Sequence, residues 1–287
     1  MESFVEYRAS AYEATIIKAN DDSVPTYPYI KTGNGDLKMW SVSAQHGRSF
    51  IVDKTHDGRY IISKGNGLSY TTHTFVNTGE MGSDTWGLLL KKDAIRDFTL
   101  GNEIASLGIK TNEMEYVIEL DTLINLPNGE TVRPKLLQYS VKCPYRISDA
   151  PFIDKSLIDI EVAKWHNLTD CKHEKKYQVA AEVLLKNLRT LHDHKILHNA
   201  IHEQNFTWAL ELLDFELASS PTNPYDSEDY QRHVIDLFSR EIIQTYQVIL
   251  YIAGVLREDV DYKYLDTMFR DYGFDISKYS VPFLEFS

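Results

Sequence analysis

The chain has 287 residues, of which 43% are hydrophobic and 25% charged, and this composition excludes a disordered or fibrous protein. Its 42 acidic and 30 basic side chains give a net charge of -12. That balance argues against nucleic acid or an anionic membrane as a partner, because both need a basic surface. The two cysteines, Cys143 and Cys171, are too few for a disulfide framework. The sequence has no secretory signal and no uncharged apolar run near the roughly 18 residues of a membrane helix. We therefore expect a soluble, cytoplasmic protein that binds neither nucleic acid nor membrane.

The first half of the chain predicts mostly strands. Residues 1–35 are polar and rich in turn signals, and a strand-like pattern then runs from 38 to 64. Asp57-Gly58 separates two β-rich runs of that segment, which indicates a hairpin. Two further strand-like runs, 114–120 and 134–143, are separated by a Pro-Asn-Gly turn.

One amphipathic helix is predicted between these groups of strands, over residues 91–107. Its apolar positions are Ile95, Phe98, Ile104 and Leu107, which share one helical face. Gly108 follows as a C-terminal cap.

After Pro151 the pattern becomes helical. Residues 174–193 predict one helix, 228–256 a long buried helix and 260–271 a final helix. Only the segment 210–218, LELLDFELA, has the pattern of a strand.

This order of elements predicts an α+β fold of two lobes. Strands with one helix come first and helices follow, which is the plan of a sheet-containing lobe packed on a helical lobe with a cleft between them. We place a β-rich N-lobe at residues 1–147 and a helical C-lobe at residues 148–287.

The most specific motif lies between His198 and Asp214. A helix ends, a loop with the sequence HNAIHEQN follows, and nine residues after Asn205 the apolar run LELL ends at Asp214. In kinase-type sites, an Asn and an Asp on adjacent elements hold the metal that bridges the nucleotide phosphates. The sequence therefore predicts a bilobal, protein-kinase-like fold with Mg²⁺ or Mn²⁺ bound by Asn205 and Asp214.

A lysine in the N-lobe extends this pattern. Lys64 ends a strand-like run and precedes Gly65-Asn66-Gly67, so its ammonium and the backbone of Gly65 and Gly67 are candidates for binding phosphate. Glu103, on the predicted helix, is our candidate to pair with Lys64 and orient it.

Several segments together resemble one family, selenoprotein O, the kinase-fold protein adenylyltransferases. The similar runs are KGNGLSYTTHTF, LLLKKDAIRDFTLGNEIASLGIKTNEMEYVIEL, LLQYSVKCPYRISDAPF and HNAIHEQNF with LLDFE, and WSVSAQHGRSFIV precedes them. They lie in the family's order between about residue 38 and residue 217.

The resemblance implies a reaction and a set of roles. Family members bind ATP in an inverted orientation, so that AMP is transferred to a hydroxyl group of an acceptor, here a protein, a peptide or a small molecule. By position, Lys64 and Arg146 would hold the distal phosphates, and Glu103 would orient Lys64. Asn205 and Asp214 would bind magnesium.

The chain departs from the family at positions that matter for catalysis. Tyr139 stands where the first of two paired arginines is expected, and Lys142 nearby is expected on the other face of its strand. Ala200 and Gln204 occupy the two places where related sites carry an aspartate base. Glu203 or His202 is the remaining candidate for that base.

Three functions stay open at this point. The first is an ATP-dependent nucleotidyltransferase, the second a phosphotransferase with the ordinary orientation of ATP, and the third a catalytically inactive pseudokinase that binds and regulates a partner.

Overall fold

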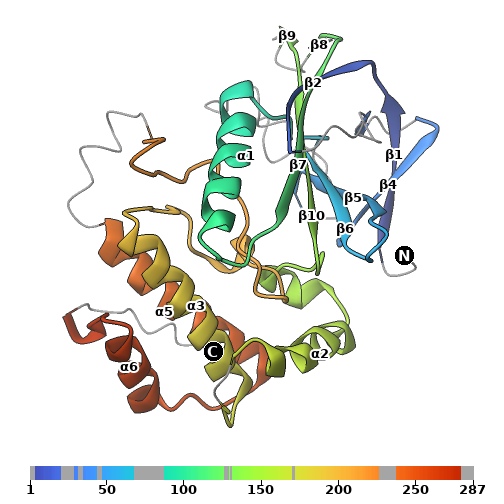
Figure 1. Ribbon diagram of the computed structural model, residues 1–287. Coiled ribbons are helices and arrows are strands. Elements are labelled where there is room, and N and C mark those ends of the chain that lie inside the picture. Colours follow the sequence, from blue (N-terminus) through green and yellow to red (C-terminus); the bar gives the residue numbers. More distant parts are fainter. Residues whose placement is uncertain are drawn as a thin grey trace.

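A mixed α/β structure, with an antiparallel sheet and a group of helices, is formed by the part of the chain that the computed structural model describes (Figure 1). This part comprises residues 4–20, 29–31, 35–43, 47–67, 87–125, 129, 131–169, 172–225 and 237–278.

The large sheet has eight antiparallel strands in the order β2-β7-β10-β6-β5-β4-β1-β3. In chain order they are β1 (Val5–Ala11), β2 (Ala14–Ala19), β3 (Tyr29–Lys31), β4 (Leu37–Ser41), β5 (Ser49–Lys54), β6 (Tyr60–Lys64), β7 (Glu113–Leu120) and β10 (Lys135–Val141). The short strands β8 (Ile124–Asn125) and β9 (Thr131–Val132) pair with each other between β7 and β10.

The N-terminal segment joins the two ends of this sheet. β1 pairs with β4, whereas β2 pairs with β7 at the opposite end, and only Tyr12 and Glu13 separate β1 from β2. Six strand spacings in a flat sheet amount to roughly 29 Å, but the connection from Ala11 to Ala14 reaches only about 11 Å. The sheet is therefore strongly curved, which brings β1, next to the end strand β3, close to the end strand β2.

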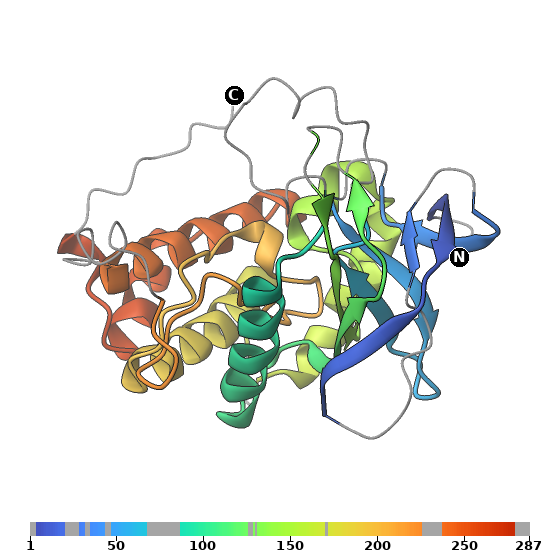
Figure 2. The same ribbon diagram turned by 90° about the horizontal axis from the view of Figure 1, so that it is seen from above.

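Helix α1 (Lys91–Ser106) packs on this sheet beside β7 (Figure 2). Gly101 permits the close approach, because a Cβ atom there would lie 2.3 Å from the Cε atom of Met114 on β7. β2 also holds the helix. Lys18 donates to the hydroxyl of Thr99 at 3.0 Å, and the Asn20 amide donates to Asn102 on α1 at 2.8 Å.

The remaining helices are α2 (Lys155–Ala163), α3 (Lys176–Asp193), α5 (Leu237–Leu256) and α6 (Tyr262–Asp271), with short 3-10 turns at Ile147–Phe152, Lys164–Asn167, Glu203–Asn205 and Ile276–Lys278. α3 packs against both α5 and α6, and both views place these three helices to one side of the sheet (Figures 1 and 2). In the 3-10 turn that follows α2, Trp165 stacks on Trp208 with ring centroids 6.1 Å apart. The indole N–H of Trp165 donates to the Trp208 carbonyl. No helix within the described ranges is long and apolar enough to cross a membrane.

Most elements predicted from periodicity are confirmed. The 38–64 strands correspond to β4, β5 and β6, and the predicted Asp57-Gly58 turn is present, with Gly58 at φ +85° donating to the Thr55 carbonyl. The 91–107, 174–193 and 260–271 helices correspond to α1, α3 and α6. The 228–256 helix is confirmed as α5, and its predicted part before residue 237 lies outside the described residues, as do Pro127 and Asn128 of the Pro-Asn-Gly turn.

Three features of the fold differ from the sequence-based expectation. The predicted strand at 210–218 is wrong, because only isolated bridges such as Phe206 with Leu212 form there and the chain then turns. The sequence predicts only turns over residues 1–35, where β1 and β2 lie, because the exposed residues of these strands weaken the alternation of polar and apolar side chains. α2 is also a helix that periodicity did not predict.

Asn20 provides a test of the contact between β2 and α1. Its amide donates to the Met114 carbonyl at 2.7 Å as well as to Asn102, and its oxygen accepts from the Asn102 amide at 3.0 Å, so Asn20→Ala removes three hydrogen bonds. We expect the free energy of unfolding to fall by about 1–2 kcal/mol, measured by urea denaturation. Glu13→Ala, a change of an exposed side chain next to β2, is the control and is expected to unfold like the wild type. Equal stability of Asn20→Ala and Glu13→Ala would contradict this role.

Candidate active site

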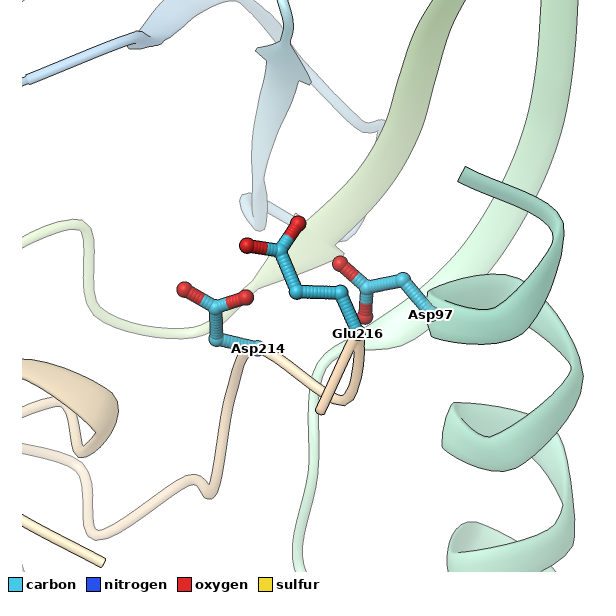
Figure 3. Close-up of side chains that lie close together, drawn as sticks. All are labelled: Asp97, Asp214 and Glu216. Carbon is cyan, nitrogen blue, oxygen red and sulfur yellow. The ribbon is translucent and has the colours of Figure 1, made fainter. Parts of the chain in front are cut away.

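The centre of the site is the buried ammonium group of Lys64. Its side chain is 3% exposed, and its Nζ atom lies 2.7 Å from Asp97 Oδ2, 2.6 Å from Asp214 Oδ1 and 3.3 Å from Glu216 Oε2. The three carboxylates converge from two parts of the chain, Asp97 from α1 and the other two from the segment after residue 213 (Figure 3). One cation thus holds the sheet, α1 and this segment together.

The backbone on which each of these side chains lies determines its position. Lys64 is the last residue of the central strand β6, where it pairs with Ser49 of β5 and Leu137 of β10. Asp97 lies on the buried face of α1, and its second oxygen accepts the backbone N–H of Phe215 at 2.9 Å. Asp214 adopts a left-handed conformation, with φ +68°, which asparagine and aspartate tolerate better than most residues.

Burial and the neighbouring charges together set the pKa values of this cluster. Burial alone would lower the pKa of Lys64, but the charges of Asp214, Asp97 and Glu216 raise it above its usual range. Burial opposes ionisation of Asp214 as well, yet Lys64 and Arg146 lower its pKa well below its ordinary value. Burial raises the pKa of Asp97, and the neighbouring carboxylates of Asp214 and Glu216 add to that effect.

A cavity of about 330 Å³ opens beside the Lys64 cluster. Its lining includes three cationic side chains, Arg48, Lys64 and Arg146, together with the carboxylate of Asp214. Asp149 also lies in the lining, but one of its carboxylate oxygens accepts the Arg146 backbone N–H at 2.6 Å. Three cations around one cavity suit an anionic ligand that carries several charges.

Asn205 lies next to Asp214 across a short antiparallel contact. Phe206 bridges Leu212, and the backbone N–H of Leu213 donates to the Asn205 carbonyl at 2.9 Å. The Asn205 side chain is buried, and its amide nitrogen donates to the Ala200 carbonyl at 2.9 Å. This bond assigns the amide orientation and makes Oδ1 the atom with which Asn205 would bind a cation.

The donor set fits a magnesium ion chemically. A carboxylate and an amide oxygen are hard ligands of the kind that Mg²⁺ prefers, and two adjacent chain segments present them. The carboxylates of Asp97, Asp214 and Glu216, whose oxygens lie within 4.8 Å of one another, by contrast already surround the Lys64 ammonium, and Glu216 also pairs with Arg48.

The loop that carries Asn205 is held from two sides. His198 is fully buried, its Nε2 atom lies 2.8 Å from the Leu213 carbonyl, and its Nδ1 atom accepts the backbone N–H of Ala200. The buried carboxylate of Glu241 on α5 accepts the backbone N–H of Asn199 at 2.6 Å and lies 3.1 Å from His192. The loop therefore has little freedom to move relative to α5.

The predicted partner of Lys64 was wrong. Glu103 accepts hydrogen bonds from the hydroxyls of Ser220 and Thr222 at 3.0–3.1 Å, and Asp97 takes its place at the lysine. The two acidic residues are six positions apart, which corresponds to about 240° around a helix, so only one of them can face Lys64. The I-R-D-F motif contained Asp97, but spacing alone did not distinguish it from Glu103.

The other predicted site residues differ in whether they line the cavity. Arg146 lines the cavity with Lys64 and donates to the Gln204 carbonyl at 2.9 Å. Gly65 and Gly67 both have positive φ, and a Cβ atom at Gly65 would lie 2.6 Å from the Lys135 carbonyl oxygen, so the backbone there requires glycine. Glu203 is in a 3-10 turn and is not among the described residues that line the cavity.

Sequence reasoning missed two charged residues of the site. Arg48 was noticed only as part of a Gly-Arg segment, and Glu216 only as the end of the LLDFE run. Arg48 donates to both carboxylate oxygens of Glu216, at 2.6 and 2.7 Å. Their 168-residue separation explains why no local pattern connected them.

Comparison with protein-family models and with curated proteins found no match. Among solved structures, the chain is similar to a Toxoplasma gondii specific rhoptry antigen kinase domain, with 11% sequence identity and a TM-score of 0.42. The match covers 77% of this chain and 68% of that chain. A similarity of this size carries no argument, so the interpretation of the site rests on its own geometry.

Substitutions at the two acidic residues of α1 test which one supports Lys64. Asp97→Ala leaves a buried ammonium with one partner fewer and a backbone N–H without its acceptor, so we expect a loss of about 3 kcal/mol in the free energy of unfolding. Glu103→Ala removes hydrogen bonds to two hydroxyls nearer the surface and is expected to cost about 1 kcal/mol. Urea denaturation of both variants gives the ranking, and an equal or reversed ranking would contradict the assignment.

His198 makes stability depend on pH. Burial lowers its pKa below the ordinary 6.5, so the unfolded chain binds the proton first as the pH falls. Stability is therefore complete above about pH 6.5 and decreases below it, by at most about 1.4 kcal/mol per pH unit from this residue. Urea denaturation between pH 7.5 and 5.5 measures the slope, and His198→Gln is expected to flatten it. An unchanged slope in that variant would assign the effect to another group.

Proposed function

We propose that the protein is an ATP- and magnesium-dependent transferase with a protein-kinase-like fold and the chemistry of selenoprotein O. It transfers AMP from ATP to a hydroxyl group of a protein, peptide or small-molecule acceptor. The observation that carries this proposal is the Lys64 ammonium, held between Asp97 and Asp214 at the wall of a cavity that Arg146 also lines. A lysine oriented by a helical carboxylate beside a metal-binding aspartate is the arrangement that phosphate transfer uses.

Different residues of the site bind the phosphates of ATP and the metal. Lys64 and Arg146, which both line the cavity, bind phosphate oxygens. Gly65 and Gly67 follow Lys64 but are not among the described residues that line the cavity. Asn205 and Asp214 would hold Mg²⁺ (or Mn²⁺), which supplies charge neutralisation on the phosphates when bound. Lys64 must then exchange part of its contact with Asp214 for a contact with phosphate.

Transfer of AMP requires a balanced substitution at phosphorus. The acceptor oxygen forms a bond to the α-phosphorus, the bond from that phosphorus to the bridging oxygen breaks, and pyrophosphate leaves. The hydroxyl proton passes to a base. His202 is our candidate for this role, because burial lowers the pKa of its imidazole and favours the neutral form, and its Nε2 atom lies 3.4 Å from the Asn205 amide nitrogen. Neither His202 nor Glu203 is among the described residues that line the cavity.

Two alternatives have their own support. Ala200 and Gln204 lack the carboxylate of related sites, and Tyr139 is buried where a second arginine was expected. These three departures favour a pseudokinase that binds a partner without turnover. A phosphotransferase with ordinary ATP orientation would use the same lysine and metal residues.

Labelled ATP separates the three functions. The protein is incubated with Mg²⁺ and with ATP labelled at either the α- or the γ-phosphate, in the presence of a cell extract as the acceptor source. We expect covalent incorporation of the α label, with release of pyrophosphate. Incorporation of the γ label alone would establish the phosphotransferase, and binding of ATP without incorporation of either label would favour the pseudokinase.

Asp214→Asn serves as the control for that experiment. It keeps the size of the side chain but removes the charge that binds the metal, so we expect incorporation to fall at least 100-fold. A melting curve confirms that the variant is folded. Glu103→Gln, which lies on the same helix as Asp97 but away from Lys64, is expected to retain incorporation.

A further inference from the structure

Glu211 is a buried carboxylate that the proposed reaction does not use. Its side chain is 1% exposed, and it lies between Asn205 and Asp214 in the sequence but is not among the described residues that line the cavity. The Thr207 hydroxyl donates to this carboxylate at 3.1 Å and accepts the backbone N–H of Glu211 at 3.2 Å. The turn from residue 207 to residue 211 therefore fixes the direction of the carboxylate.

The Glu211 carboxylate binds two other parts of the chain. Its oxygens accept the backbone N–H of Lys142 at 3.0 and 3.1 Å and that of Cys143 at 3.4 Å, directly after β10 ends. One oxygen also lies 3.6 Å from the guanidinium of Arg59, whose side chain is 7% exposed. Arg59 in turn donates to the hydroxyl and the carbonyl of Ser140 on β10. The end of β10, the residue before β6 and the turn before Asp214 thus meet at one buried ion pair.

The Arg59–Glu211 pair complements the Lys64–Asp214 pair. Arg59 precedes β6 and Lys64 ends it, so both ends of this strand form an ion pair with the same segment of the chain. One ion pair alone would let β6 turn about that contact, whereas two pairs oppose such a rotation.

The residues that Glu211 holds lead directly to Arg146. Arg146 forms an antiparallel bridge with Thr207, which follows Asn205 by two residues, and its side chain lines the cavity. Only Pro144 and Tyr145 separate it from Cys143. A shift of the backbone at Cys143 would therefore move the guanidinium of Arg146 at the cavity wall.

We infer that Glu211 is a positioning residue, which fixes the segment of Arg146 against the turn between Asn205 and Asp214. This inference rests on the proposed function, because it concerns how a guanidinium of the same cavity is placed. Glu211 itself acts only through Arg146 and makes no contact with the ligand.

The role requires a carboxylate, because every group that approaches it is a donor. An amide has one acceptor oxygen and one donor nitrogen, so Glu211→Gln directs a donor toward another donor. A buried backbone N–H or the Arg59 guanidinium then lacks its acceptor. The remaining ionic contact of Arg59 is with the exposed carboxylate of Glu113, at 3.1 Å.

Calorimetry with inorganic tripolyphosphate in EDTA tests this role without a nucleoside or a metal. We expect Glu211→Gln to weaken binding about 10-fold, because a displaced guanidinium loses its charge-assisted contact with the anion. Glu258→Gln is the matched control, since Glu258 also accepts two consecutive backbone N–H groups, those of Lys176 and Tyr177, but at the start of α3. It is expected to lower the melting temperature and to leave the affinity unchanged. Melting curves confirm that each variant is folded at the temperature of the titration.

The Arg146→Met background shows whether Glu211 acts through Arg146. In that background we expect Glu211→Gln to change the affinity less than about 2-fold, whereas a general loss of structure would lower it equally in both backgrounds. Amide hydrogen exchange gives a second measurement that needs no ligand. We expect residues 142–147 to exchange about 10-fold faster in Glu211→Gln than in the wild type.

The outcomes separate this inference from the proposed function. The role of Glu211 would be overturned by unchanged tripolyphosphate affinity or unchanged exchange in Glu211→Gln, by an equal loss of affinity in Glu258→Gln, or by an equal loss in both backgrounds. An ATP-dependent reaction would remain intact in each of these cases. If the wild type binds neither tripolyphosphate nor ATP with Mg²⁺, both the inference and the proposed function fail.

Discussion

The burial of one ammonium group, that of Lys64, is the constraint on which the site depends. A charge with 3% of its side chain exposed costs several kcal/mol unless it is paired, and here the pairs come from α1 and from the segment that contains Asp214 and Glu216. β6 therefore has to lie against both of these elements for the charge to be compensated. The lysine that serves as a candidate ligand-binding group is thus also the link between the sheet and the helix that covers it.

The fold supplies the rigidity that such a link needs. The N-terminal segment closes the curved sheet and hydrogen-bonds to α1 through Lys18 and Asn20, and Gly101 lets that helix approach β7. On the opposite side, Glu241 of α5 fixes the backbone of the loop that leads to Asn205. The two groups of catalytic candidates are therefore held by separate supports, and they meet at the Lys64–Asp214 ion pair.

Periodicity predicted the elements well because most of them bury one face, as the confirmed α1 and α3 do. It failed at β1 and β2, whose side chains are largely exposed, and at residues 210–218, where an apolar run folds into turns and bridges. Within the site, Lys64, Asn205 and Asp214 were predicted from local motifs, and Arg146 only from the family resemblance. Asp97 was confused with Glu103, and the Arg48–Glu216 pair was missed, because helix rotation and contacts across 168 residues leave no local pattern.

The balance of charge in the free protein bears on how an anionic ligand would bind in this cavity. Arg48, Lys64 and Arg146 lie among the carboxylates of Asp97, Asp214, Glu216 and Asp149, so the three cations of the cavity already have anionic partners in the free protein. A nucleoside triphosphate that entered without a metal would displace carboxylates from their cations. The displaced carboxylates would then lie near the negative charge of the triphosphate. In the proposed function, a divalent cation at Asn205 and Asp214 would compensate one displaced carboxylate, and Lys64 would exchange a carboxylate partner for phosphate. In the proposed function, binding of the anion and binding of the metal would therefore be coupled, because each would remove an electrostatic cost that the other creates.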